Sequence, residues 1–248
     1  MRELLMAIKI AAARLITSNF FGRLIQWYTR GFISYQQLSI NTNFSQVNPE
    51  SKASLFWGLY EKSEVGYIQK YLPKNSPVIE LGSSLGVTSC VIGTKIFPEE
   101  LFCVEANPAL VPIIETNLKR NGVTNAKVMN VALGEGIVYF QPGVSNTVGH
   151  VAPTKGVGSI AVSAMSLSEI VNYLKIDTFS LVCDIEGSEC HILFEDFKSL
   201  DRCTMVIIEL HQTDFKGKLI TENDMINRLI DLRFKIAESH GRVVVAIK

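Results

Sequence analysis

The sequence shows no excess of charge of either sign, since 24 lysines and arginines balance 24 aspartates and glutamates. A strong basic field, which would indicate a nucleic-acid partner, is therefore missing. Paired cysteines are missing too, because the five cysteines stand singly, without a CxxC pair. This usage predicts buried, reduced thiols in a cytoplasmic protein and argues against structural zinc or a disulfide framework.

An uninterrupted apolar span is also absent. Residues 1–30 carry apolar side chains at helical spacing, but Lys9 and Arg14 interrupt any stretch long enough to cross a bilayer. The run from Leu4 to Ile8 is short for a signal-peptide core. Five basic side chains against one acidic one leave two alternatives: a helix packed on the domain or on a second subunit, or a basic amphipathic segment on an anionic membrane surface.

From residue 51 onward, apolar runs alternate with helical patterns. This alternation predicts an α/β fold with a mostly parallel sheet, covered by helices on both faces and closed by a C-terminal antiparallel hairpin. Strands are expected at 78–81, 101–104, 127–133, 138–140, 179–183 and 205–210, helices at 54–71, 87–97, 108–121, 166–174, 189–197 and 222–232, and the hairpin at 234–238 and 242–247.

Two polar stretches interrupt this pattern. Residues 31–50 are rich in Ser, Asn and Gln and predict a linker or a substrate-side loop, and a Gly/Ser/Thr-rich loop is expected at 141–158. We therefore expect an N-terminal helical extension and linker at 1–50, followed by a cofactor-binding domain at 51–248.

A glycine-containing turn follows the first expected strand. Gly82 and Gly86 allow a ligand to approach the backbone, and the helix that follows offers unpaired N–H groups. The spacing lacks the middle glycine of the dinucleotide fingerprint G-x-G-x-x-G, so a pyrophosphate contact is poorly supported. Glu80, directly before the turn, would repel a diphosphate and attract a cationic α-amino group.

Glu105 ends the next expected strand, 25 residues after Glu80. A carboxylate at that place accepts hydrogen bonds from both hydroxyls of a ribose. A cofactor with adenosine at one end and an amino acid at the other would satisfy both carboxylates. S-adenosyl-L-methionine has that structure.

Six segments together resemble the FkbM-type family of S-adenosylmethionine-dependent methyltransferases. The resemblance spans about residues 75–248 and implies a Rossmann-like class I methyltransferase fold with a seven-stranded sheet. The family usually has Asp, Ala and Asn where Glu80, Ser83 and Ser84 stand, and Lys where Val182 stands. The segments are VIELGSSLGVT (78–88), VEANP (104–108), NLKRNG (117–122), VALG (131–134), VCDIEGSE (182–189) and VIIELH (206–211).

The resemblance also implies an activity, the O-methylation of a hydroxyl on a small-molecule or carbohydrate acceptor, such as a sugar, a polysaccharide or a glycosylated natural product. Gly82, Ser83 and Gly86 would line the methionine and ribose, whereas Ala106 and Asn107 would flank the adenine. The full set of expected cofactor contacts is Glu80, Gly82, Ser83, Gly86, Thr88, Glu105, Ala106, Asn107, Ala132 and Asp184.

Three polar residues at or just beyond strand ends are the catalytic candidates. Methyl transfer needs an aligned acceptor oxygen and removal of the hydroxyl proton. We expect His211 or Asp184 to act as the base and Glu186 to orient the acceptor. A divalent metal held by Asp184, Glu209 and His211 is a second, less favoured possibility.

Two other functions stay open at this point. The first is a non-catalytic cofactor-binding or scaffold protein on the same fold. The second is an NAD-dependent oxidoreductase, which the glycine spacing and Glu80 disfavour. Peripheral membrane contact or a homodimer through residues 1–30 is compatible with each.

Overall fold

The computed structural model describes residues 12–143, 149–152 and 154–248. It divides the chain into two compact units, with the boundary between Lys62 and Ser63. The expected boundary at residue 50 falls inside the first unit, within helix α3 (Pro49–Phe56).

The first unit contains a hairpin where a linker was expected. Strands β1 (Phe32–Tyr35) and β2 (Leu38–Asn41) pair antiparallel, and their buried side chains alternate with exposed or half-buried ones. Gln36 and Gln37 form the connection with φ of 50° and 67°, the conformation that a two-residue turn between twisted strands requires. Glutamine is an unusual residue for such a turn, so the polar composition concealed the hairpin.

The prediction of a single helix at 54–71 is wrong. Helix α3 ends at Phe56, and α4 (Lys62–Tyr71) begins six residues later. Gly58 and Glu61 adopt φ of 68° and 42° between them. Left-handed residues cannot continue a right-handed helix, so the pattern is divided into two.

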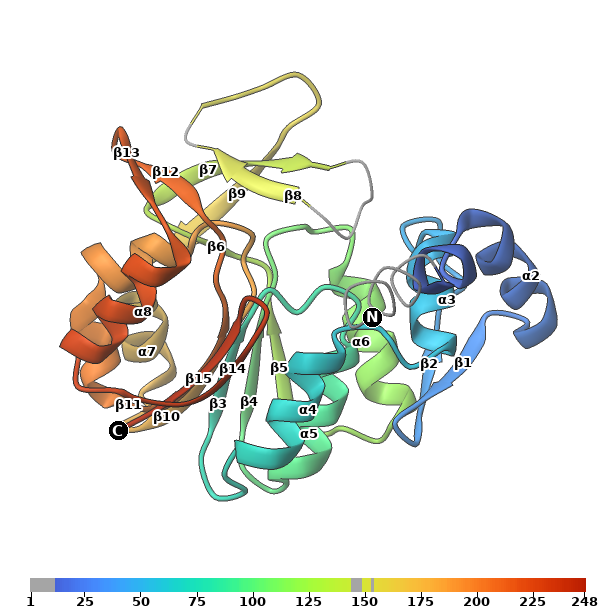
Figure 1. Ribbon diagram of the computed structural model, residues 1–248, viewed down its shortest axis with the longest axis horizontal. Coiled ribbons are helices and arrows are strands. Elements are labelled where there is room, and N and C mark those ends of the chain that lie inside the picture. The colour runs from blue at the N-terminus through green and yellow to red at the C-terminus, as the bar shows by residue number, and fades with distance from the viewer. Residues whose placement is uncertain (1–11, 144–148, 153) are drawn as a thin grey trace, which may run out of the picture. The chain divides into compact units, whose positions relative to one another are not determined.

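The second unit is built on a seven-stranded sheet with the order β14-β15-β11-β10-β3-β4-β5 (Figure 1). All neighbours pair parallel except at β15, which runs against both of its neighbours. This confirms the mostly parallel sheet and the C-terminal hairpin. The strands are β3 (Val78–Leu81), β4 (Leu101–Val104), β5 (Ala126–Met129), β10 (Phe179–Cys183), β11 (Cys203–Glu209), β14 (Lys235–His240) and β15 (Val243–Ile247).

The antiparallel strand of the hairpin was expected at the edge of the sheet, but it lies one place inside the edge. Strand β15 is apolar and almost entirely buried, whereas β14 is half-buried or exposed along its length. The more apolar strand gains more from burial on both faces, so β14 forms the edge.

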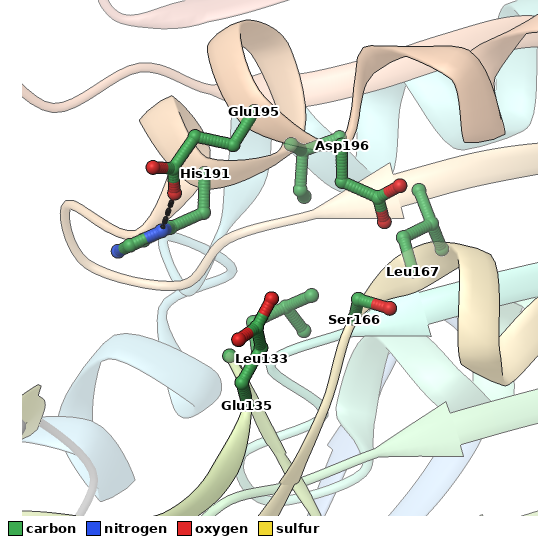
Figure 2. Close-up of a pocket in the computed structure, with 9 residues that line it drawn as sticks. Leu133, Glu135, Ser166, Leu167, His191, Glu195 and Asp196 are labelled. Atoms are coloured by element: carbon green, nitrogen blue, oxygen red, sulfur yellow. Dashed lines mark hydrogen bonds and ion pairs between the residues drawn. The ribbon is translucent and has the colours of Figure 1, made fainter.

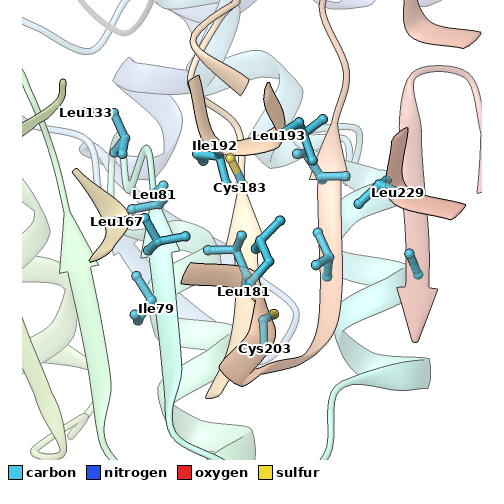
Figure 3. Close-up of a cluster of buried hydrophobic side chains, with 14 of the residues drawn as sticks. Ile79, Leu81, Leu133, Leu167, Leu181, Cys183, Ile192, Leu193, Cys203 and Leu229 are labelled. Carbon is cyan, nitrogen blue, oxygen red and sulfur yellow. The ribbon is translucent and has the colours of Figure 1, made fainter. Parts of the chain in front are cut away.

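Helices cover both faces of the sheet, as predicted (Figure 1). On one face, Ile79, Leu81, Leu181 and Cys183 belong to a buried cluster that includes Leu229 (Figure 3). Successive side chains of a strand point to opposite faces, so the residues between these must point the other way. The helices are α5 (Val87–Ile96), α6 (Val111–Arg120), α7 (Leu167–Leu174) and α8 (Glu222–Asp231).

A second sheet was not foreseen. Its order is β6-β9-β7-β8, and it has a small apolar core of its own. The strand expected at 127–133 is divided between β5 and this sheet, and the loop expected at 141–158 contains β8. Its strands are β6 (Ala132–Leu133), β7 (Gly136–Pro142), β8 (Gly149–Ala152) and β9 (Ile160–Met165), and a separate hairpin consists of β12 (Thr213–Phe215) and β13 (Lys218–Ile220).

Two expected helix positions need correction. The helix at 108–121 begins at Val111, because Asn107 instead closes a tight turn by accepting the N–H of Ala109. The helix at 189–197 is a π-helix (η1, His191–Glu195) followed by a 3-10 helix (η2, Phe197–Arg202). Asp196 separates them and accepts the N–H of Ser168 at 2.7 Å.

Among the described helices, none has both the length and the apolar character needed to cross a bilayer.

We predict that Gly82→Ala strongly destabilises the second unit. Gly82 has φ of 88°, and a Cβ there would collide with the carbonyl oxygen of Asp184. Gly122→Ala is the matched control, because φ is 67° but nothing lies near the added methyl group. Urea unfolding should show a loss of about 1–2 kcal/mol for the control and a clearly larger loss for Gly82→Ala. Equal losses would contradict the close approach.

Candidate active site

The turn after β3 is shaped by three left-handed residues. Gly82, Ser84 and Gly86 have φ of 88°, 47° and 73°, and the N–H of Gly86 donates to the carbonyl of Ser83 at 2.7 Å. Gly86 is the N-cap of α5. The backbone therefore turns sharply above the sheet at the C-terminal ends of the parallel strands, where ligands of such sheets bind.

Glu80 lies beneath this turn and not at its surface. Ile79 and Leu81 face the buried cluster on one side of the sheet, so the side chain of Glu80 points to the α5 side. It is 1% exposed and accepts hydrogen bonds from the hydroxyls of Ser83 and Ser89. Burial raises the pKa of Glu80, which hydrogen bonds from Ser89, Thr88 and Ser83 oppose.

Two more of the expected cofactor contacts share this interior position. Ser83 is fully buried and Thr88 is 4% exposed. In this structure Glu80, Ser83 and Thr88 lie in the interior beneath the turn, where their hydrogen bonds stabilise it. Their expected contact with a cofactor stays a prediction.

Glu105 follows β4 and holds the turn from the other side. Its Oε2 accepts the N–H of Ser84 and its Oε1 accepts the N–H of Asn107, each at 2.8 Å. Burial raises the pKa of Glu105 to about 7, although these two backbone hydrogen bonds lower it. Each carboxylate oxygen keeps a further lone pair, so Glu105 can accept two neighbouring hydroxyls.

The residues expected around an adenine are less accessible. Asn107 is 2% exposed, and its side chain closes the turn before α6. Ala132 is 1% exposed within the core of the second sheet, and Ala106 is half-buried beside that core. The burial of Ala132 leaves little surface for a ligand, so its role too stays a prediction.

The three catalytic candidates do come together. One ligand atom each of Asp184, Glu186 and His211 lies within 4.8 Å of the others. Asp184 follows β10, and its N–H donates to the carbonyl of Leu81 at the end of β3. His211 follows β11, the next strand in the sheet. Their meeting agrees with the expectation that polar residues at the ends of parallel strands face one crevice, although Asp184 and His211 are 27 positions apart.

The loop after β10 is strained at the residue that faces His211. Glu186 has φ of 51° and Gly187 has φ of 101°. A non-glycine residue in this region costs about 1–3 kcal/mol, and such residues occur at functional sites as well as in turns. The carboxylate of Glu186 lies 3.5 Å from Nε2 of His211.

Glu189 is the residue of this site that the sequence did not single out as catalytic. It is fully buried, and its Oε1 lies 2.9 Å from Nδ1 of His211. The same oxygen accepts the N–H of Gly187 at 3.2 Å. A carboxylate that holds Nδ1–H fixes the ring orientation and directs Nε2 toward the open side. The signal in the sequence was its place in the segment VCDIEGSE (182–189), from which either a contact with substrate or stabilisation of a helix N-terminus was possible.

The pKa values of His211 and Asp184 are both raised in this cluster. Burial lowers the pKa of His211, but its hydrogen bond to Glu189 and the charges of Glu189, Asp184 and Glu186 prevail and raise it to about 9. Burial raises the pKa of Asp184 to about 7, helped by the charges of Glu209 and Glu186. Oδ1 of Asp184 is buried and has no hydrogen-bond partner among the described residues.

The same three side chains offer oxygen and imidazole ligands to a divalent cation. Glu186 takes the place in this set that Glu209 was expected to fill, and Glu209 lies 3.7 Å from Nε2 of His211. Exposed acidic groups often gather without a metal, so the metal stays the less favoured possibility.

A separate pocket of about 200 Å³ lies between the end of β6, the start of α7 and η1 (Figure 2). None of the expected site residues lines it. His191 and Glu195 form a hydrogen-bonded pair on its wall. It is smaller than ligand pockets usually are, and its lining gives no indication of a nucleotide.

The order of the parallel strands reverses between β3 and β10, and the turn at Gly82 and the Asp184 cluster lie at this switch point. This topology defines a Rossmann-like α/β domain, and domains of this kind bind their ligands at the switch point.

Comparison with known proteins finds no family model and no curated protein that matches the sequence. Solved structures do match. Precorrin-6y C5,15-methyltransferase from Geobacter metallireducens is 13% identical, with a TM-score of 0.46, over 76% of this chain and 90% of that chain. Aeropyrum pernix fibrillarin in complex with S-adenosyl-L-methionine is 12% identical, with a TM-score of 0.44, over 71% of this chain and 69% of that chain.

A protein of the NADB-Rossmann superfamily from Streptococcus agalactiae is 13% identical, with a TM-score of 0.42 over 74% of this chain, and this chain spans 65% of its length. Likeness at this level says nothing about ligand or substrate. Because no family model matches, the resemblance to the FkbM-type family stays a prediction.

We predict that Glu189→Gln lowers the pKa of His211. The amide keeps the shape of the side chain but removes the negative charge that stabilises the imidazolium. Proton NMR of the His211 ring, recorded with chelator, should show titration below the wild-type value of about 9.

Glu195→Gln is the matched control, because Glu195 bonds the Nδ1 of exposed His191 in the same way. It should leave the titration of His211 unchanged. An unchanged His211 in the Glu189 variant would show that Glu189 does not hold the ring.

Proposed function

We propose that this protein is an S-adenosylmethionine-dependent methyltransferase that methylates a hydroxyl group. The observation that carries the proposal concerns two side chains that follow strands on either side of the switch point. Glu105 is a buried carboxylate that can accept hydrogen bonds from the hydroxyls of a ribose, and His211 is oriented by the buried carboxylate of Glu189. The first suits the cofactor and the second suits proton removal.

The donor set fits the cofactor at two places. Glu105 has a free lone pair on each oxygen for the two ribose hydroxyls. Buried Oδ1 of Asp184, at the end of β10 and on the other side of β3 from Glu105, suits a cationic group such as an ammonium or a sulfonium. A pyrophosphate would instead bring negative charge to this acidic crevice, which supports a methyl donor over a dinucleotide.

When bound, the cofactor supplies an electrophilic methyl group on a sulfonium. The protein's part is to align the acceptor oxygen and to remove its proton. Nε2 of His211 lies 3.5 Å from the exposed carboxylate of Glu186, so in this proposal His211 takes the proton while Glu186 hydrogen-bonds the acceptor. Glu189 holds the Nδ1–H and stabilises the imidazolium that results. Asp184 is the other candidate base.

The acceptor class rests on the FkbM-type motifs alone. They support O-methylation of a sugar, a polysaccharide or a glycosylated natural product. A cytoplasmic enzyme with a small-molecule or carbohydrate acceptor agrees with the neutral overall charge.

We predict that the protein binds S-adenosylhomocysteine and not NAD in calorimetry, and that Glu105→Gln weakens this binding. Hydrogen bonds to a charged group contribute about 1.5–3 kcal/mol, so a loss of about tenfold or more is expected. Glu115→Gln, an exposed change in α6, is the control and should bind as the wild type does. Tighter binding of NAD would refute the proposal, and a labelled methyl-transfer screen with sugar acceptors would test its second half.

We predict that the pH profile of kcat/KM distinguishes the two candidate bases. A base works unprotonated, so the rate rises with pH through its pKa. With His211 as base the rise should continue to about 9, whereas with Asp184 it should level off above about 7. His211→Ala should then abolish the upper rise. If Asp184→Asn and His211→Ala both kept full turnover with unchanged cofactor affinity, neither residue would be the base.

A further inference from the structure

Helix α2 (Asn19–Thr29) presents its more apolar side outward. Gly22 and Ile25 are its buried residues, and a Cβ on Gly22 would collide with the carbonyl oxygen of Pro49 at the start of α3. This side therefore packs on α3. A helix at the surface of a protein is expected to carry polar residues on its other side.

The opposite side carries large apolar residues instead. Phe20, Leu24 and Trp27 recur at i, i+4 and i+7, which places them on one stripe. They are 71%, 49% and 78% exposed, and Tyr28 beside them is 73% exposed. The ring of Tyr28 lies 6.5 Å from that of Phe56, so the patch continues onto α3. We call these five residues the α2 patch.

The charges around the α2 patch are mainly basic. Arg14, Arg23 and Arg30 are exposed, and Glu50, which accepts a hydrogen bond from Asn19 at the start of α2, is the one acidic residue in positions 12–56. Two copies of the chain that met through this patch would bring like charges together, which disfavours a homodimer. The partner should instead be anionic and should accept apolar side chains.

A bilayer with anionic headgroups meets both requirements. Tryptophan and tyrosine favour the boundary between headgroups and acyl chains, and a helix with apolar and basic sides lies in that plane. We propose that the α2 patch docks the protein on the surface of an anionic phospholipid membrane. This goes beyond the proposed methyl transfer and does not depend on it.

The test is co-sedimentation of the full chain with vesicles of phosphatidylcholine, alone or mixed with phosphatidylglycerol. Binding should require the anionic lipid and should fall with salt. Leu24→Ser with Trp27→Ser should weaken it at least about tenfold. Arg23→Gln and Arg30→Gln should each weaken it about fivefold. Tyr173→Ser, a 70% exposed aromatic on α7, and Lys119→Gln, an exposed base on α6, are the matched controls and should bind as the wild type does.

A second measurement does not depend on a polar substitution. The chain has two tryptophans, and Trp57 packs edge-to-face on Phe56 of the α2 patch. In Trp57→Phe, where Trp27 alone emits, entry of Trp27 into the bilayer should shift the emission to the blue. The proposal would be overturned if the protein did not bind anionic vesicles, or if the patch variants bound them as the wild type does. It would also be overturned if light scattering showed a dimer that dissociates in the serine variant.

Discussion

The close approach of Gly82 to the backbone of Asp184 is the constraint on which the site depends. Asp184 donates its N–H to Leu81, and its carbonyl lies where a side chain at position 82 would stand. The turn after β3 and the loop after β10 are therefore held against each other by backbone alone. The expected cofactor turn and the catalytic cluster share one edge of the sheet because of this contact.

A second constraint is the concentration of negative charge at that edge. Asp184, Glu186, Glu189 and Glu209 all lie around His211. Burial, together with carboxylates so close to one another, destabilises the ionised state, which explains the raised pKa of Asp184. A protein keeps such an arrangement where function requires it, and both a protonated histidine and a cationic ligand would relieve it.

Position 182 can now be understood from the sheet register. Val182 lies beside Glu80 on the neighbouring strand and alternates with Leu181 and Cys183, which face the buried cluster. The lysine that the FkbM-type family usually has there would therefore stand beside Glu80 on the α5 side, and not in the Asp184 cluster. In this chain the hydroxyl groups of Ser83 and Ser89 bond only Oε2 of Glu80, and its buried Oε1 has no hydrogen-bond partner among the described residues.

The sequence by itself determined the α/β alternation, the parallel sheet and the closing hairpin, and it singled out Asp184, Glu186 and His211 as candidates, because continuous apolar runs and the polar residues that end them are local signals. It did not reveal the second sheet, or the hairpin at Gln36 and Gln37, because glutamine has no strong preference for such a turn. Only the tertiary structure decided that Glu80 is buried under the turn, that Glu189 holds His211, and that α2 turns its aromatic side outward. Each of these depends on which face a side chain meets, and that is set by strand register and helix packing between segments far apart in the chain.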